Sequence, residues 1–286
     1  MSANNSSILR QYEIPTWAVL VIIYGGWFAL LAMWHVLPLY VIAPVGAVLL
    51  TWFGSLQHEV MHGHPTRNQK LNDWLVAFPL WLWIPYQRYK ASHLAHHRNE
   101  IITCPIEDPE SFYVTPQTWR AMPRWRKKFL MLRNTLLGRL TVGPLETLII
   151  FYRNEILAMS AGKTKVIRAW QWHIAGAGGV LAILLSCGIN PLVYFAFLVY
   201  PSISLTLLRS FAEHKFDPDP KHRSAIIETG LFWRMLYLNN NYHALHHDYP
   251  GIPWYELPAK YEGARDSVLA RNGYYHITGY SALVRK

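Results

Sequence analysis

The sequence predicts an all-α integral membrane protein with four transmembrane helices, paired as two hairpins, and a cytoplasmic histidine-rich helical cap. Two observations predict this class. Hydrophobic residues make up 52% of the 286-residue chain and charged residues only 15%. The lysines and arginines are also segregated, because none lies between Arg10 and Arg67 or between Arg168 and Arg209. Long apolar blocks separated by basic segments are typical of a chain whose solvent includes lipid.

Each of the two apolar blocks has the length of a helical hairpin. We expect the first block to cross the membrane over residues 15–36, turn at Pro38 and return over residues 39–56. We expect the second to cross over residues 169–187 and return over residues 192–208, with a turn between them. These lengths approach the ~20 residues that span a hydrocarbon core of about 30 Å. The whole chain, residues 1–286, is predicted to form a single domain around these spans.

Both hairpins bring the chain back to one side of the membrane. The segments 57–168 and 209–286 then share that side, and both are rich in lysine and arginine. The positive-inside rule therefore places them in the cytoplasm. We expect no nucleic-acid partner despite the net charge of +10, because the cations alternate with long charge-poor apolar blocks.

Eight of the 14 histidines fall into three short motifs. His58 and His62 are four residues apart, and the spacing HxxHH occurs at residues 93–97 and again at residues 243–247. Residues three and four apart share one face of a helix, so each motif can direct its imidazoles to a common point. A ninth histidine, at position 214, follows the fourth predicted span. The predicted metal ligands are His58, His62, His93, His96, His97, His214, His243, His246 and His247.

Nine imidazoles exceed the needs of one ion, because a zinc site uses three or four protein ligands. The set suits two metals with positions left open for dioxygen or water. Imidazole binds zinc, copper, iron and nickel, so the ligand type alone does not identify the metal. A zinc protease is a different hypothesis, since His58-Glu59-x-x-His62 matches the HExxH helix of such enzymes. That hypothesis gives neither HxxHH motif a role.

The order of these motifs resembles the membrane fatty-acid desaturase superfamily. HxxxH, HxxHH, the dipeptide Glu213-His214 and a second HxxHH follow one another around two predicted hairpins. The segments HEVMHGH, SHLAHHRNE and NNNYHALHHDYPGIPWYELP are similar to those of bacterial members. The superfamily also includes lipid hydroxylases and carotenoid ketolases, and the last segment resembles those as well.

The resemblance implies a non-haem di-iron enzyme in a bacterial inner membrane, with its active site on the cytoplasmic side. The nine histidines would hold two iron ions, and no further catalytic or cofactor-binding residue is predicted. With dioxygen as co-substrate, the enzyme would remove hydrogens from a long-chain lipid or fatty acyl chain. Hydroxylation of a lipid or hydrocarbon, or oxidation of a carotenoid, remains an alternative for the same site.

Electrons are expected from a separate protein, because the sequence contains no haem domain and no flavin or nicotinamide fingerprint. A ferredoxin or rubredoxin with its reductase would serve. The basic run at residues 120–139 suits either an acidic carrier or anionic lipid headgroups. Carboxylates and amides near the histidines could accept the second imidazole N–H. The candidates are Glu59, Asp108, Glu213, Asp248 and Asn239–Asn241.

Overall fold

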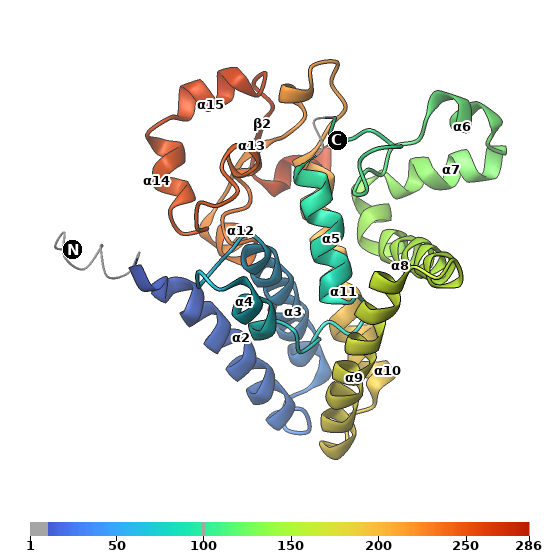
Figure 1. Ribbon diagram of the computed structural model, residues 1–286, viewed down its shortest axis with the longest axis vertical. Coiled ribbons are helices and arrows are strands. Elements are labelled where there is room, and N and C mark those ends of the chain that lie inside the picture. The colour runs from blue at the N-terminus through green and yellow to red at the C-terminus, as the bar shows by residue number, and fades with distance from the viewer. Residues whose placement is uncertain (1–10, 99–100, 286) are drawn as a thin grey trace. The chain divides into compact units, whose positions relative to one another are not determined.

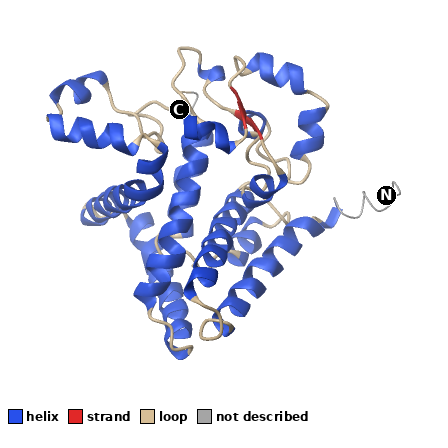
Figure 2. Ribbon diagram, turned by 180° about the vertical axis from the view of Figure 1, so that it is seen from behind, coloured by secondary structure: helices blue, strands red, loops and turns tan. Residues whose placement is uncertain are grey.

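The computed structural model describes residues 11–98 and 101–285, and its regular secondary structure is almost entirely helical (Figure 1). Figure 2 shows the same predominance of helix, with one short pair of strands. The predicted all-α class is confirmed. The chain divides into two compact units by its internal contacts: unit 1 comprises Met1–Arg88 and Arg153–Ile203, and unit 2 comprises Tyr89–Tyr152 and Ser204–Lys286.

Unit 1 is built around a helical hairpin in which α2 (Ile14–Ala32) packs along α3 (Leu39–Met61) (Figure 1). Pro15 lies in the first turn of α2, and Pro38 caps α3. Proline is tolerated at these positions because the first N–H groups of a helix have no partner within it. The other elements of this unit are α4 (Gln69–Leu75), α9 (Thr164–Ser186), α10 (Pro191–Tyr194) and the π-helical turn η1 (Phe195–Val199).

Glycines allow close packing inside unit 1. A Cβ atom on Gly46 would lie only 2.4 Å from Cγ of Leu198. On Gly54, a Cβ atom would lie 2.3 Å from the Trp81 ring. Contacts of this kind hold helices together where lipid removes the hydrophobic drive for association. The indole N–H of Trp81 is buried in this packing and donates a hydrogen bond to Ser202 Oγ at 2.6 Å.

Within residues 11–98 and 101–285, three helical stretches are long and apolar enough to cross a membrane. They are Ile14–Ala32, Leu39–Met61 and Pro191–Glu213, the last of which joins α10, η1 and α11 (Tyr200–Glu213). They match the predicted spans at 15–36, 39–56 and 192–208. Large apolar side chains on the first two remain exposed, with Val21 at 65% and Tyr40 at 80%. Helices that face lipid expose apolar side chains in this way.

The remaining predicted span, at 169–187, corresponds to α9, which is not one of these three stretches. Its first half contains Arg168, Gln171 and His173, and such residues lower the hydropathy of a helix. His173 Nε2 lies 2.9 Å from the carbonyl oxygen of Leu82, so this buried ring has a partner within unit 1. The topology with four spans therefore stays a prediction.

Unit 2 contains most or all of each of the remaining elements. They are α5 (Tyr86–His97), α6 (Pro116–Ala121), α7 (Arg124–Arg133), α8 (Leu136–Ser160), η2 (Pro220–His222), α12 (Leu231–Leu236), α13 (His243–Asp248), α14 (Leu257–Glu262), α15 (Arg265–Arg271) and η3 (Tyr280–Arg285). The strand β1 (Ile226–Glu228) pairs in parallel with β2 (His276–Thr278). Ile226, Leu245, Leu257 and Val268 belong to one buried core. This core joins α13 to the C-terminal helices and so fixes the position of the second HxxHH motif.

Candidate metal centre

Four histidines of unit 2 bring their Nε2 atoms together. His96 lies on α5, His214 directly follows α11, and His243 and His247 lie on α13. The Nε2 atom of His214 is 3.1 Å from that of His96 and 2.9 Å from that of His243. His247 Nε2 is 3.1 Å from His243 Nε2. All four ligand atoms lie within 4.8 Å of one another, and we call this group the tetrad.

In two rings of the tetrad the opposite nitrogen, Nδ1, faces a hydrogen-bond acceptor. His96 Nδ1 lies 2.8 Å from Asp108 Oδ1, and His243 Nδ1 lies 3.4 Å from Asn240 Oδ1. An imidazole that donates its Nδ1–H to an oxygen keeps the lone pair on Nε2 free for a metal. The donor set of the tetrad therefore fits a metal ion.

Burial keeps most of the tetrad in the neutral form that binds metal. It lowers the pKa of His214 to about 3. It also takes the pKa of His243 and of His247 well below the ordinary value. Burial acts on His96 in the same direction, but the hydrogen bond with Asp108 and the surrounding carboxylates outweigh it, so the pKa of His96 is raised. A metal must displace a proton only from a ring that carries one, so three of the four rings are ready to bind.

Asp108 is itself held in place by the loop that contains it. Its carboxylate accepts the backbone N–H of Thr103 at 2.7 Å and that of Glu110 at 2.9 Å. Burial alone would raise the pKa of Asp108, but the hydrogen bond and charge of His96, together with these backbone N–H groups, lower it. The carboxylate is therefore ionised and fixed in one orientation, which fixes the ring of His96 as well.

A second polar chain supports His243. Arg209 pairs with Glu213 one turn later on α11, at 3.0 Å. Glu213 Oε1 accepts a hydrogen bond from Asn240 Nδ2 at 2.8 Å and lies 3.5 Å from His243 Nδ1. All four side chains are buried. The end of α11 and the start of α13 are thus joined through charged and amide groups beside the tetrad.

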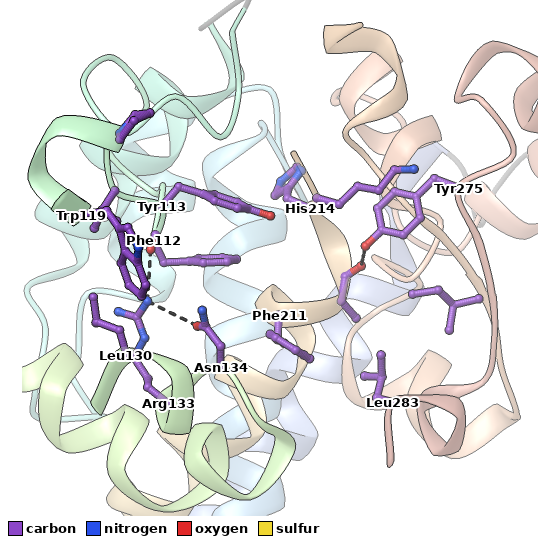
Figure 3. Close-up of a pocket in the computed structure, with 15 residues that line it drawn as sticks. Phe112, Tyr113, Trp119, Leu130, Arg133, Asn134, Phe211, His214, Tyr275 and Leu283 are labelled. Atoms are coloured by element: carbon purple, nitrogen blue, oxygen red, sulfur yellow. Dashed lines mark hydrogen bonds between the residues drawn. The ribbon is translucent and has the colours of Figure 1, made fainter. Parts of the chain in front are cut away.

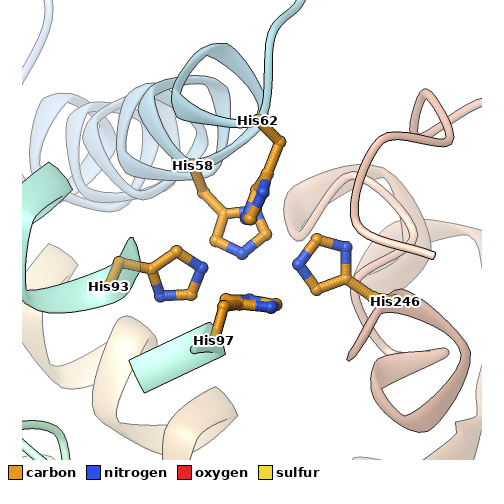
Figure 4. Close-up of side chains that lie close together, drawn as sticks. All are labelled: His58, His62, His93, His97 and His246. Atoms are coloured by element: carbon orange, nitrogen blue, oxygen red, sulfur yellow. The ribbon is translucent and has the colours of Figure 1, made fainter. Parts of the chain in front are cut away.

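Three further histidines of unit 2 form a second group, which we call the trio. His93 and His97 lie on α5 and His246 lies on α13. Figure 4 shows their rings directed toward one another. The ring centroid of His97 is 4.5 Å from that of His93 and 4.8 Å from that of His246. Both HxxHH motifs therefore contribute to both groups.

Glu110 supports the trio and was not predicted. Its carboxylate lies 3.3 Å from His93 Nδ1. Partial burial alone would raise the pKa of Glu110, but the charge and hydrogen bond of His93, together with other nearby cations, bring it to about 2. The sequence signal was available, because Glu110 follows Asp108 by two residues in the segment EDPES.

Unit 1 carries the remaining predicted pair. His58 lies in the last turn of α3 and His62 caps that helix, with their ring centroids 5.0 Å apart. Figure 4 shows both rings extending from the same end of α3. The helix continues past residue 56, where the predicted span ended, and this continuation gives the two imidazoles a common face.

The remaining candidates for supporting roles lie elsewhere. Glu59 Oε1 is 3.8 Å from His64 Nε2 within unit 1. Asp248 pairs with Arg271. The amides of Asn239 and Asn241 donate to backbone carbonyl oxygens, at 2.9 and 2.8 Å. Of the predicted supporting residues, Asp108, Glu213 and Asn240 are thus the ones placed beside the tetrad.

One histidine from each group reaches a common polar cleft. His97 of the trio and His247 of the tetrad stack with ring centroids 4.3 Å apart and ring planes 15° apart. Both line a cleft of about 280 Å³, together with Lys221 and Arg271. This cleft gives solutes access to an edge of both groups.

Apolar helices of membrane length and clustered buried imidazoles define a membrane protein with a histidine-rich candidate metal centre. The family model for fatty acid desaturases matches residues 32–279, which include all nine predicted histidines. The chain belongs to the fatty acid desaturase family, and the resemblance seen in the sequence is confirmed. No curated protein sequence matches it. Membership of this family implies an oxidoreductase and leaves the zinc-protease hypothesis for His58-Glu59-x-x-His62 without support.

Proposed function

We propose that the protein is an oxygen-dependent di-iron oxidoreductase that removes hydrogens from a long-chain lipid or fatty acyl chain. The tetrad carries this proposal, because four Nε2 atoms converge while acceptors face the Nδ1 atoms of His96 and His243. Structural histidines in a core need no such convergence. Family membership supplies the direction of the chemistry.

The proposed ligands divide between two iron ions. The tetrad would hold one ion, and His93, His97 and His246 would bind the other. The family resemblance makes His58 and His62 ligands of the iron pair as well. When bound, the two irons would use dioxygen to remove hydrogen from an unactivated C–H bond.

The chain's own residues would orient the ligands and keep water away from them. Asp108 and Asn240 fix the tautomers of His96 and His243. The burial of these rings, at 1 and 2% exposure, limits access of bulk water. A dry, rigid ligand set needs little reorganisation during the reaction.

We further propose the membrane arrangement that the charge pattern favours. The chain would have four spans, with α9 as the third, and would carry its histidines at the cytoplasmic face of a bacterial inner membrane. The Lys- and Arg-rich composition of segments 57–168 and 209–286 supports this orientation. A separate soluble donor, such as a ferredoxin or rubredoxin with its reductase, would supply electrons. The cleft beside His97 and His247 carries Lys221, which suits an acidic carrier, while Arg271 in the same cleft is paired with Asp248.

The test is mass spectrometry of total lipids from a host that expresses the protein together with a ferredoxin system. The inactive control is the His93→Ala/His97→Ala variant, and His222→Ala is the matched control, since His222 belongs to neither group. We expect a lipid that has lost two hydrogens with the wild type and with His222→Ala but not with the double variant. We also expect two irons per chain in the purified wild type.

A gain of one oxygen instead of a loss of two hydrogens would assign hydroxylation or carotenoid oxidation to the same site. One zinc per chain and no iron, after expression in iron-rich medium, would contradict the di-iron proposal.

A further inference from the structure

Unit 2 contains a second, larger cavity of about 560 Å³ beside the tetrad. Figure 3 shows its aromatic wall, with Phe112, Tyr113 and Trp119 on one side and Phe211 and Tyr275 on the other. This volume lies in the range of ligand sites, which are mostly apolar with a few placed polar groups.

The cavity reaches the tetrad through His214. The ring of His214 is part of the lining (Figure 3), while its Nε2 faces His96 and His243 at 3.1 and 2.9 Å. A molecule in this cavity would therefore contact a proposed metal ligand. A substrate site needs this kind of access to the metal ligands, whereas a structural void does not need it.

The tyrosine hydroxyl groups of the wall are already engaged. Tyr113 Oη accepts the backbone N–H of Phe216 at 2.9 Å, and Tyr275 Oη donates to the carbonyl oxygen of Ala212 at 2.8 Å. The O–H of Tyr275 is thus used, whereas Tyr113 accepts a hydrogen bond and can still donate its own O–H to a ligand. The charged part of polar recognition depends on the cationic side of the cavity.

Arg133 supplies the buried cation that lines the cavity. Its Nη1 donates a hydrogen bond to Glu146 Oε2 at 3.0 Å, and its Nη2 donates one to the carbonyl oxygen of Phe112 at 3.1 Å. The residue is only 9% exposed. A buried guanidinium is costly unless anionic groups compensate its charge.

A second guanidinium lies directly behind the wall. Arg139 is 3% exposed and lies 4.3 Å from the ring centroid of Phe112 and 4.9 Å from that of Phe211, both of which line the cavity. Burial and the charge of Arg133 lower the pKa of Arg139 to about 10, so it is still a cation at pH 7. Glu146 is the carboxylate at this end of the cavity, and it pairs with Arg133. Two buried cations against one carboxylate leave this end of the cavity positive.

We propose that this cavity binds an amphipathic anion, with its carboxylate or phosphate at Arg133 and its apolar chain along the aromatic wall toward His214. The inference rests on the proposed function and names the substrate class of that site. It selects a fatty acid or an acyl lipid with an anionic end over an uncharged carotenoid or hydrocarbon, because a neutral molecule would leave the positive end uncompensated.

The test measures binding of three twelve-carbon probes, dodecanoate, dodecyl phosphate and dodecanol, to the iron-loaded full-length protein in lipid nanodiscs. The key comparison is between Glu146→Gln and Glu146→Gln/Arg133→Gln, since these variants differ only at Arg133 and neither leaves Glu146 as an unpaired buried charge. We expect Glu146→Gln to bind the anions more tightly than the wild type does. The double variant should bind them at least about tenfold more weakly than Glu146→Gln, since a hydrogen bond to a charged group is worth about 1.5–3 kcal/mol. Dodecanol should bind the two variants equally.

A further variant localises the probes. Val114 lines the cavity, and Val114→Trp should weaken all three probes by filling it. The preferred anion then distinguishes a carboxylate from a phosphate end. Equal affinity for dodecanol and both anions in every variant would overturn the inference, as would the absence of saturable binding.

Binding needs no turnover, so this inference and the proposed function fail separately. If anion binding depends on Arg133 but no oxidised lipid forms, the proposed function alone is contradicted. If a lipid is oxidised, and its binding and oxidation do not depend on Arg133, the inference alone is contradicted. Iron content measured on each sample shows whether a variant has lost its metal ligands instead.

Discussion

The tetrad and the trio draw on the same two HxxHH motifs but divide them in opposite ways. The motif on α5 gives His93 and His97 to the trio and His96 to the tetrad. The motif on α13 gives His243 and His247 to the tetrad and His246 to the trio. In each motif the two residues four apart stay together, because they share a helix face, and the third faces the other group.

The two groups differ in the carboxylate that supports them. Asp108, beside the tetrad, has a side chain that is 2% exposed and lies 2.8 Å from His96. Glu110, beside the trio, is 31% exposed by its side chain and lies 3.3 Å from His93. The same repeated motif therefore contributes to two ligand sets, of which the tetrad is supported tightly and the trio more loosely.

The largest expected effect comes from removing a ring of the tetrad. His243→Ala should lower product formation by more than about 100-fold, because the loss of even a supporting residue around a metal costs 10- to 100-fold. It should also remove one iron per chain and leave the trio's iron in place, as shown by iron analysis beside lipid mass spectrometry. Loss of both irons would mean that the two groups are not independent.

The supporting carboxylates offer a direct comparison of the two groups. Asp108→Asn should lower metal affinity or activity by about 10- to 100-fold. The same change at the looser contact, Glu110→Gln, should have a smaller effect. Titration of the apoprotein with ferrous iron checks both variants. An equal or larger loss in Glu110→Gln would break the distinction drawn between the two groups.

Packing in unit 1 should affect stability without affecting the tetrad, which lies wholly in unit 2. Gly46→Ala places a Cβ atom 2.4 Å from Leu198, and overpacking of this kind costs about 1–3 kcal/mol. The matched control is Gly25→Ala, whose Cβ atom meets nothing within 4 Å. Thermal unfolding in detergent should show a lower Tm for Gly46→Ala and not for Gly25→Ala. The tetrad's iron, measured below Tm, should be unchanged in both.

The smallest expected effect tests the attachment of the C-terminal helices to β1. Glu228 accepts hydrogen bonds from Arg265 and Tyr261, each at 2.7 Å. The bond from Arg265 is the main reason that its pKa falls to about 2. A lowered pKa stabilises the folded state above the unfolded value, near 4.5, and the effect disappears as the pH falls toward 2. Glu228→Gln should therefore lower the free energy of unfolding by under about 1 kcal/mol at pH 7.

The measurement for Glu228→Gln is the difference in Tm from the wild type across pH. It should be present at pH 7, where the carboxylate is fully ionised, and shrink below about pH 4.5. A difference that grows as the pH falls from 4.5 toward 2 would have the wrong sign for a lowered pKa.

The apolar helices were predictable because length and hydropathy are local properties. The predicted spans at 15–36, 39–56 and 192–208 match α2, α3 and the stretch Pro191–Glu213. The ends of these helices were not predictable. Helix α3 continues to Met61, through residues whose polarity suggests that the chain leaves the membrane there. Tertiary packing decides such ends, and the spacing of apolar residues does not.

Eight of the nine candidate ligands were predictable from spacing, but their division into groups was not. The spacing HxxHH predicts that its imidazoles meet at a common point, whereas the tertiary structure places His96 apart from its neighbours, with His214 and His243. The cavity lined by Arg133 was also beyond the sequence. The basic run at residues 120–139 predicts a charged surface, whereas Arg133 and Arg139 from this run are buried.

The continuity of α3 has a mechanical consequence. Pro44 lies inside α3 near its start and is the position where the helix can bend. From Val45 to Met61 the helix contains no proline, and it carries His58 in its last turn and His62 at its cap. The stretch beyond Pro44 therefore moves together with its tip. A thinner or thicker bilayer that tilts this helix to match its apolar length therefore swings both imidazoles. A change in the fatty acid composition of the surrounding membrane would then displace these two histidines, without any lipid binding to them.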